Sequence, residues 1–172
     1  MKTRTLLMAA ALAGLAAPAL AQGGPTDPQI AHIAYTAGTI DIDAAKQALS
    51  HTKTKAVRDF AQEMIRDHTA VNNKALALVK KLKVTPEANS TSASLTKEAA
   101  AARARLGKLH GAAFDRAYAE NEVKYHQTVN GALEKTLIPS AHNGELKSLL
   151  QTGLTLFREH QMHAEHLVSS LK

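Results

Sequence analysis

Apolar side chains recur every three or four residues along most of this chain, and that spacing limits what it can fold into. The clearest stretch lies between residues 54 and 84, where the spacing alternates between four and three. Its members are Val57, Ala61, Met64, His68, Val71, Ala75, Leu78 and Leu82. Such spacing places one stripe along a helix that packs in a bundle. The period-two alternation that would indicate strands is absent.

The same spacing, together with the prevalence of Ala, Leu, Lys, Glu and Gln, predicts five helices. We place them near residues 28–51, 54–83, 95–109, 112–137 and 145–170. Residues 85–94 are rich in Ser, Thr and Asn and are predicted to form a loop, and Pro139 is expected to close the fourth helix. The predicted fold is all-α: an antiparallel four-helix bundle with one extra short helix before the third long helix.

The N-terminus has the features of an export signal. A positively charged start, an apolar run over residues 6–17 and the small-x-small sequence Ala19-Leu20-Ala21 are typical of a secretory signal peptide. We therefore predict a signal peptide over residues 1–21, a flexible leader over 22–26 and one bundle domain over 27–171. The expected location is periplasmic or otherwise exported.

Composition excludes several kinds of function. The 172 residues contain no cysteine, so disulfides, thiolate catalysis and zinc-thiolate sites are excluded. Aromatic residues make up 3% of the chain and offer no stacking platform for nucleic acid. No later segment is apolar enough to predict an integral membrane anchor. The net charge of +6 leaves open weak association with an anionic envelope, and a homo-oligomer also remains open.

Four of the nine histidines lie on or beside predicted apolar stripes. His68 belongs to the stripe of the second helix, and His126 follows Glu122 by one helical turn. On the last helix the predicted stripe contains two histidines; it consists of Leu146, Leu149, Gly153, Leu156, His160, His163 and Leu167. The stripe of the first helix consists of Ile30, Ile33, Ala37, Ile40, Ala44 and Ala48.

Inward-facing imidazoles and carboxylates on several helices are the elements of a metal site in a bundle. We predict that His68, His126 and His160 converge on one layer, with ring nitrogens of at least two within about 5 Å. The candidate metal ligands are His68, His126, His160, His163, Glu122 and Asp67.

The kind of metal site follows from a missing motif. Glu-x-x-His, which di-iron bundles use, occurs at none of His68, His126 and His160. A mononuclear, histidine-rich site for zinc or copper is therefore favoured, with iron as a further candidate. The alternative is an envelope-stress or structural protein whose histidine–carboxylate layer only fixes the bundle. Such a layer could also respond to protons, because histidine titrates near neutral pH.

Three sequence segments resemble a known family. They are Phe60-Ala61-Gln62-Glu63-Met64-Ile65-Arg66-Asp67-His68, Phe114-Asp115-Arg116-Ala117-Tyr118 and Phe157-Arg158-Glu159-His160. Over residues 27–171 the chain resembles the exported bacterial proteins of the domain-of-unknown-function 4142 family. The resemblance implies a ferritin-like four-helix bundle. It places the family's polar positions at Asp67, His68, Asp115, His126, His160 and, less closely, His163. Neither the motifs nor the resemblance assigns an enzymatic activity.

Overall fold

The computed structural model describes residues 23–171 and is helical over most of that range. The predicted signal peptide lies outside the described residues. The elements are α1 (Asp27–His51), α2 (Lys55–Leu82), α3 (Ser90–Leu106), α4 (Gly111–Ala132), the π-helical turn η1 (Leu133–Leu137), α5 (Ile138–Ser140) and α6 (Gly144–Ser170). The described chain contains no strand, which confirms the all-α prediction. Over the same part of the chain, no helix combines the length and apolar character needed to cross a membrane.

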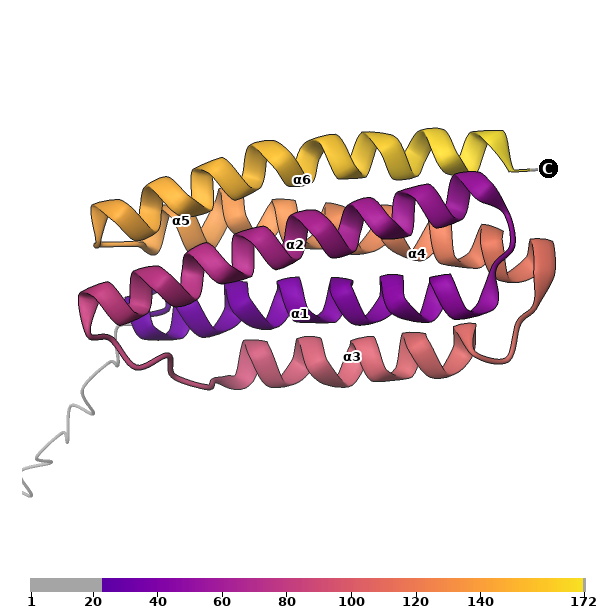
Figure 1. Cartoon of the computed structure of the whole chain (residues 1–172). Helices are drawn as coiled ribbons and strands as arrows, with labels where there is room; N and C mark the ends of the chain where they lie inside the picture. The colour runs from indigo at the N-terminus through magenta and orange to yellow at the C-terminus, as the bar shows by residue number, and fades with distance from the viewer. Residues whose placement is uncertain (1–22, 172) are drawn as a thin grey trace, which may run out of the picture.

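Helices α1, α2, α4 and α6 form the core bundle, and the helices that pack against each other within it run in opposite directions (Figure 1). Helix α1 packs against α2 and α4, and α6 packs against α2 and α4. Helix α3 lies outside this core against α1, and it returns the chain to the other end of the bundle. Because of this return, α4 runs in the same direction as α2. The two helices lie diagonally across the bundle core from each other. The predicted helical bundle, with an extra helix before the third long one, is thus confirmed.

The core consists of two apolar clusters separated by a polar layer. One cluster includes Phe60, Phe114 and Leu167, and it fills the end where α1 joins α2. The other includes Ile30 and Leu146 and fills the opposite end. Between them lie five buried ionisable residues, which we call the polar layer: Asp41, His68, Glu122, His126 and His160. The helices therefore bring their inward polar residues to one level of the bundle.

Helix α3 begins earlier than the sequence pattern predicts. The composition of residues 90–94 predicts a loop, but they form the first turn of this helix, which ends at Leu106 rather than Leu109. The reason is capping: the Asn89 side chain accepts a hydrogen bond from the Ser92 amide at 3.0 Å, and the Ser92 hydroxyl lies 3.2 Å from the Asn89 amide. A segment rich in Ser, Thr and Asn is usually a loop. The same side chains, however, can accept hydrogen bonds from the free backbone amides at the start of a helix.

The end of α4 also differs from the expectation that Pro139 closes this helix. The helix passes into the wider π-helical turn η1, and Pro139 lies within the single turn α5 that follows. Proline has no amide hydrogen to donate to the helix, and its ring clashes with the backbone carbonyl four residues earlier. The irregular turns before and at Pro139 carry the chain past this position.

Two predicted stripes are wrong by one residue at several positions. Helix α6 buries Leu150, Phe157 and Ala164, where the predicted stripe had Leu149, Leu156 and His163. Helix α1 buries Asp41 in place of Ile40. Adjacent residues differ by about 100° around a helix, so a three–four spacing admits either of two neighbours. Packing against the other helices selects between them.

Candidate metal centre

The polar layer receives at least one side chain from each helix of the core. Asp41 comes from α1, His68 from α2, Glu122 and His126 from α4, and His160 from α6. All five are at most 3% exposed. Each lies on the inward face because apolar residues one turn before or after it pack into the two core clusters. Four helices thereby enclose one group of acids and bases.

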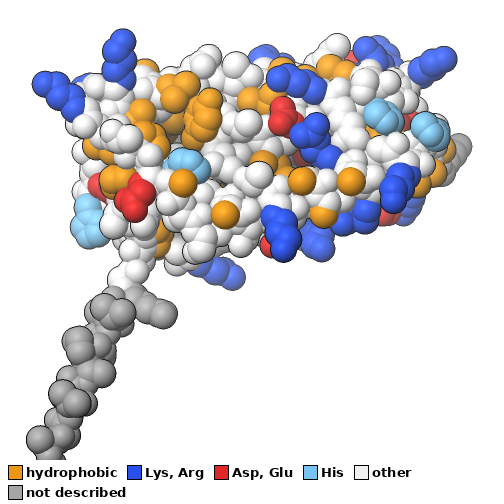
Figure 2. All heavy atoms as spheres, turned by 90° about the horizontal axis from the view of Figure 1, so that it is seen from below, with side chains coloured by type: hydrophobic (Ala, Val, Ile, Leu, Met, Phe, Trp, Pro, Cys, Tyr) orange, Lys and Arg blue, Asp and Glu red, His pale blue; other side chains and the backbone are white. Residues whose placement is uncertain are grey.

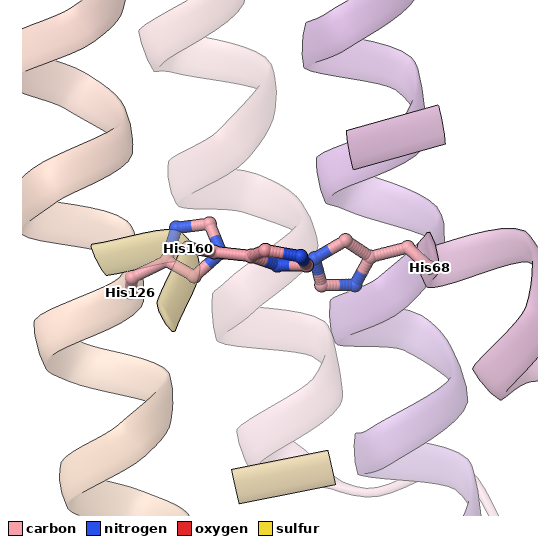
Figure 3. Close-up of side chains that lie close together, drawn as sticks. All are labelled: His68, His126 and His160. Atoms are coloured by element: carbon pink, nitrogen blue, oxygen red, sulfur yellow. The ribbon is translucent and has the colours of Figure 1, made fainter. Parts of the chain in front are cut away.

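The three imidazoles face one another at one level of the bundle (Figure 3). The ring centroids are 5.3 Å apart for His68 and His160, 5.6 Å for His126 and His160, and 5.8 Å for His68 and His126. One ring nitrogen from each lies within 4.8 Å of the other two. This agrees with the convergence expected from the helical register. Two ligands at roughly 2.0–2.1 Å from one metal ion lie at most about 4.2 Å apart, so a small inward movement of the rings would bring all three nitrogens onto one ion.

Asp41 contributes a carboxylate that the sequence analysis missed. Its Oδ2 lies 3.2 Å from His68 Nε2 and 3.4 Å from His126 Nε2. The signal was present: Asp41 follows Ala37 by four residues and precedes Ala44 by three, the same spacing that defines the stripe. The sequence favours Ile40 at this position because an apolar residue suits a core, whereas the burial of a carboxylate depends on partners from other helices.

Two neighbours fix the orientation of the His126 ring. His126 Nδ1 lies 3.0 Å from the backbone carbonyl of Glu122. A carbonyl only accepts hydrogen bonds, so Nδ1 donates to it and Nε2 points into the layer. There Nε2 lies 3.4 Å from the carboxylate of Asp41, and neither atom has a hydrogen-bond partner among the described residues. A metal ion held between them would give both atoms a partner.

Eight polar atoms of the layer, these among them, lack a hydrogen-bond partner within the described residues. They are both carboxylate oxygens of Asp41, both of Glu122, both ring nitrogens of His68, Nε2 of His126 and Nδ1 of His160. Buried polar atoms are nearly always paired, and a cluster without partners needs a physical explanation. Imidazole nitrogens and carboxylate oxygens are ligands for first-row transition metals.

Burial sets the charge of the layer. It lowers the pKa of His68 to about 4, and repulsion from His126 and His160 adds to the effect, while Asp41 opposes it. Burial also lowers the pKa of His160. His68 and His160 are therefore neutral near pH 7, the form that binds metals. Burial, and then the charge of Asp41, raise the pKa of Glu122 well above its ordinary value.

A second group of charged side chains lies outside the layer, between α2 and α6. Asp67 Oδ2 is 3.1 Å from His160 Nε2, and the Arg66 guanidinium donates to both oxygens of Asp67 at 2.7 and 2.9 Å. The hydrogen bond from Arg66 is the largest cause of the lowered pKa of Asp67. His163 lies farther out: its Nδ1 is 2.7 Å from Glu63 Oε2, and its side chain is 42% exposed. Asp67 thus holds and orients one imidazole of the layer.

Of the six candidate ligands, four share the layer: His68, His126, His160 and Glu122. Asp67 contacts the layer only through His160. The prediction that His163 lies on the core stripe is wrong, because Ala164 occupies that position and turns His163 toward solvent.

Asp115, a position implied by the family resemblance, is buried but lies away from the layer. It accepts a hydrogen bond from the Thr54 hydroxyl just before α2 begins. Its position ties the start of α4 to the turn between α1 and α2, so its role in the structure is to connect these segments.

Comparison with known proteins gives a single result. The model of the family described as Domain of unknown function (DUF4142) matches residues 9–167. No curated protein and no solved structure matches the chain. The family match extends through the helices that carry all five residues of the polar layer. The chain belongs to the DUF4142 family.

Proposed function

We propose that the protein is an exported, ferritin-like helical bundle that binds one transition-metal ion in its polar layer. The observation that carries the proposal is the set of polar atoms without partners at the centre of the bundle. His126 Nε2 lies 3.4 Å from the Asp41 carboxylate, and neither atom has a hydrogen-bond partner among the described residues. A bound cation would be attracted to both atoms and would satisfy them.

The donor set is suited to a divalent ion. His68, His126 and His160 would supply imidazole nitrogens, and Asp41 and Glu122 would supply carboxylate oxygens and negative charge. Charge of opposite sign reduces the large penalty of holding an ion away from water. Mixed imidazole and carboxylate ligands favour zinc, copper or iron. When bound, such an ion would act as a Lewis acid or, for copper and iron, as a redox centre.

The ferritin-like and exported parts of the proposal have separate support. Ferritin-like bundles carry one long connection between their second and third core helices, and α3 and its flanking loops form such a connection between α2 and α4. Export is supported by the signal-peptide pattern of residues 1–21. Fractionation of the native host with mass measurement tests it: a mature chain that begins at Gln22 in the exported fraction is the expected result, and an uncleaved cytoplasmic chain contradicts it.

The alternative is a layer that fixes the bundle without metal. The bonds from His126 to the Glu122 carbonyl and between His160 and Asp67 are of the kind such a layer would use. A structural polar network stabilises a core only when its members are satisfied. Eight nitrogen and oxygen atoms of this layer are without partners. Their number favours the metal site.

Metal binding is tested by its effect on stability. The full chain, purified without an affinity tag, is analysed for metals by mass spectrometry, stripped with a chelator and titrated with Zn²⁺, Cu²⁺ or Fe²⁺. At a free metal concentration one hundred times Kd, binding stabilises the folded state by about 2.7 kcal/mol. For a domain of this size, that raises the melting temperature by roughly 5–10 °C.

Two variants separate the metal site from the structural layer. His126→Ala is expected to abolish the response to metal, whereas His142→Ala, at an exposed position outside the layer, should leave it intact. A structural layer predicts instead a loss of roughly 1–3 kcal/mol in His126→Ala with no response to chelator in either protein. A protein that is metal-free as purified and melts at the same temperature with every added ion would refute the proposal.

A further inference from the structure

The half of the bundle beyond the polar layer contains a cavity, partly open to solvent, that the metal site does not use. Its volume is about 720 Å³, and all the core helices contribute to its walls. It extends from Phe157, beside the polar layer, to Leu146 and Val79 near the opposite end of the bundle. Along α6 this span runs over eleven helical steps, from Leu146 to Phe157, which corresponds to about 16 Å at the helical rise. The cavity is therefore elongated along the bundle axis.

The walls of this cavity are apolar and carry no charge. Of the described residues that line it, none is Asp, Glu, Lys, Arg or His, although 21% of the chain is charged. Its inner surface is formed by side chains such as Ile33, Val71, Leu133 and Leu150. Hydroxyl and amide side chains are a minority among the lining residues. An ion or a charged metabolite has no partner in such a cavity, so its chemistry favours an uncharged, apolar occupant.

Small residues account for the open space. Ala34, Ala37 and Ala75 all line the cavity. Bundle cores ordinarily reach the packing density of organic crystals, with few voids larger than a water molecule. Water is a poor occupant for walls that offer it few hydrogen bonds.

The cavity lies near hydrophobic surface at the same end of the molecule. Figure 2, viewed from the α3 side, shows hydrophobic side chains gathered at the end where α3 begins. Asn89, Ser90 and Leu95 of that region also line the cavity. An apolar molecule could therefore reach the interior beside the first turns of α3.

We propose that this cavity binds one uncharged, elongated hydrocarbon molecule, of the class of an acyl chain or a comparable apolar ligand. Phe157 forms the boundary with the polar layer: it lines the cavity, and its ring stacks on His68 with the centroids 4.5 Å apart. None of the five polar-layer residues lines the cavity. Binding of the hydrocarbon therefore does not depend on a metal.

The test uses N-phenyl-1-naphthylamine, a neutral apolar molecule whose fluorescence rises in a dry environment. The full chain is stripped of bound hydrophobic molecules and titrated with this probe, once with chelator and once without. We expect saturable binding of one probe per chain under both conditions, and native mass spectrometry should show the same stoichiometry. The absence of saturable binding to the folded protein would overturn the proposal, and it would leave the metal titration unaffected.

A matched pair of variants locates the probe. Ala75→Phe places a ring in the cavity and should weaken binding at least tenfold. Ala77→Phe, on the same helix, is exposed and does not line the cavity, so it should bind like the unaltered protein. If Ala75→Phe loses its helical circular dichroism, Ala34→Phe from α1 takes its place. Equal binding by the cavity variant and Ala77→Phe would place the probe on the surface and overturn the proposal.

Discussion

His68→Phe should remove a specific loss of stability at acid pH. His68 is 3% exposed, and its burial lowers its pKa from 6.5 to about 4. Its ring stacks on Phe157 with an angle of 11° between the planes, so a phenyl ring of similar size keeps this packing. The substitution therefore removes the titrating imidazole and retains the stacking of an aromatic ring on Phe157.

The direction in which stability changes with pH follows from how many protons the folded and the unfolded chain bind. Between pH 6.5 and about 4 the unfolded chain binds a proton at His68 that the folded chain excludes, so the stability of the metal-free protein falls as pH falls through this window. At about 1.4 kcal/mol for each pH unit, the full effect is about 3 kcal/mol. Glu122, whose pKa is raised, acts in the opposite direction: it favours folding at low pH and disfavours it as pH rises above 4.5. Glu122 is present in both proteins, so the comparison isolates His68.

The assay is urea unfolding of metal-depleted protein at several pH values from 4 to 7. Relative to the unaltered protein, His68→Phe should gain about 3 kcal/mol in its free energy of unfolding as the pH is lowered across this range. His142→Phe, at an exposed position, should show no such gain. Parallel stability profiles for His68→Phe and the unaltered protein would refute the assignment of a buried, neutral His68.

Two further substitutions test the packing and the capping of the helices. Gly38→Ala should destabilise the protein by about 1–3 kcal/mol in urea unfolding, because its added Cβ would lie 2.4 Å from Oδ1 of the buried Asn72. Gly131→Ala, which meets nothing within 4 Å on α4, should instead stabilise it by about 0.5–1 kcal/mol. Asn89→Ala should lower stability by about 1 kcal/mol, because it removes the acceptor of the Ser92 amide at the start of α3. Unchanged unfolding midpoints in Gly38→Ala and Asn89→Ala would contradict these two assignments.

Much of the fold could be predicted from local sequence alone. Along the first half of α2, the predicted stripe members Val57, Ala61, Met64 and His68 are all buried, because polar or charged residues separate most of them and leave one face for the core. Helical register also predicted that His68, His126 and His160 face the core, and all three are buried there. The largest error in a helix start is at residues 90–94, where capping by Asn89 overcame a loop-like composition.

What only the tertiary structure decided is which of two adjacent residues points inward. Ile40 and Asp41 fit the same spacing, as do His163 and Ala164, since one residue turns a helix by only about 100°. The helices that surround α1 bring two imidazoles within 3.4 Å of Asp41, and those partners make a buried carboxylate tolerable there. The acidic side of the candidate site and the exposure of His163 are therefore properties of the assembled bundle, because they depend on contacts between residues far apart in the chain.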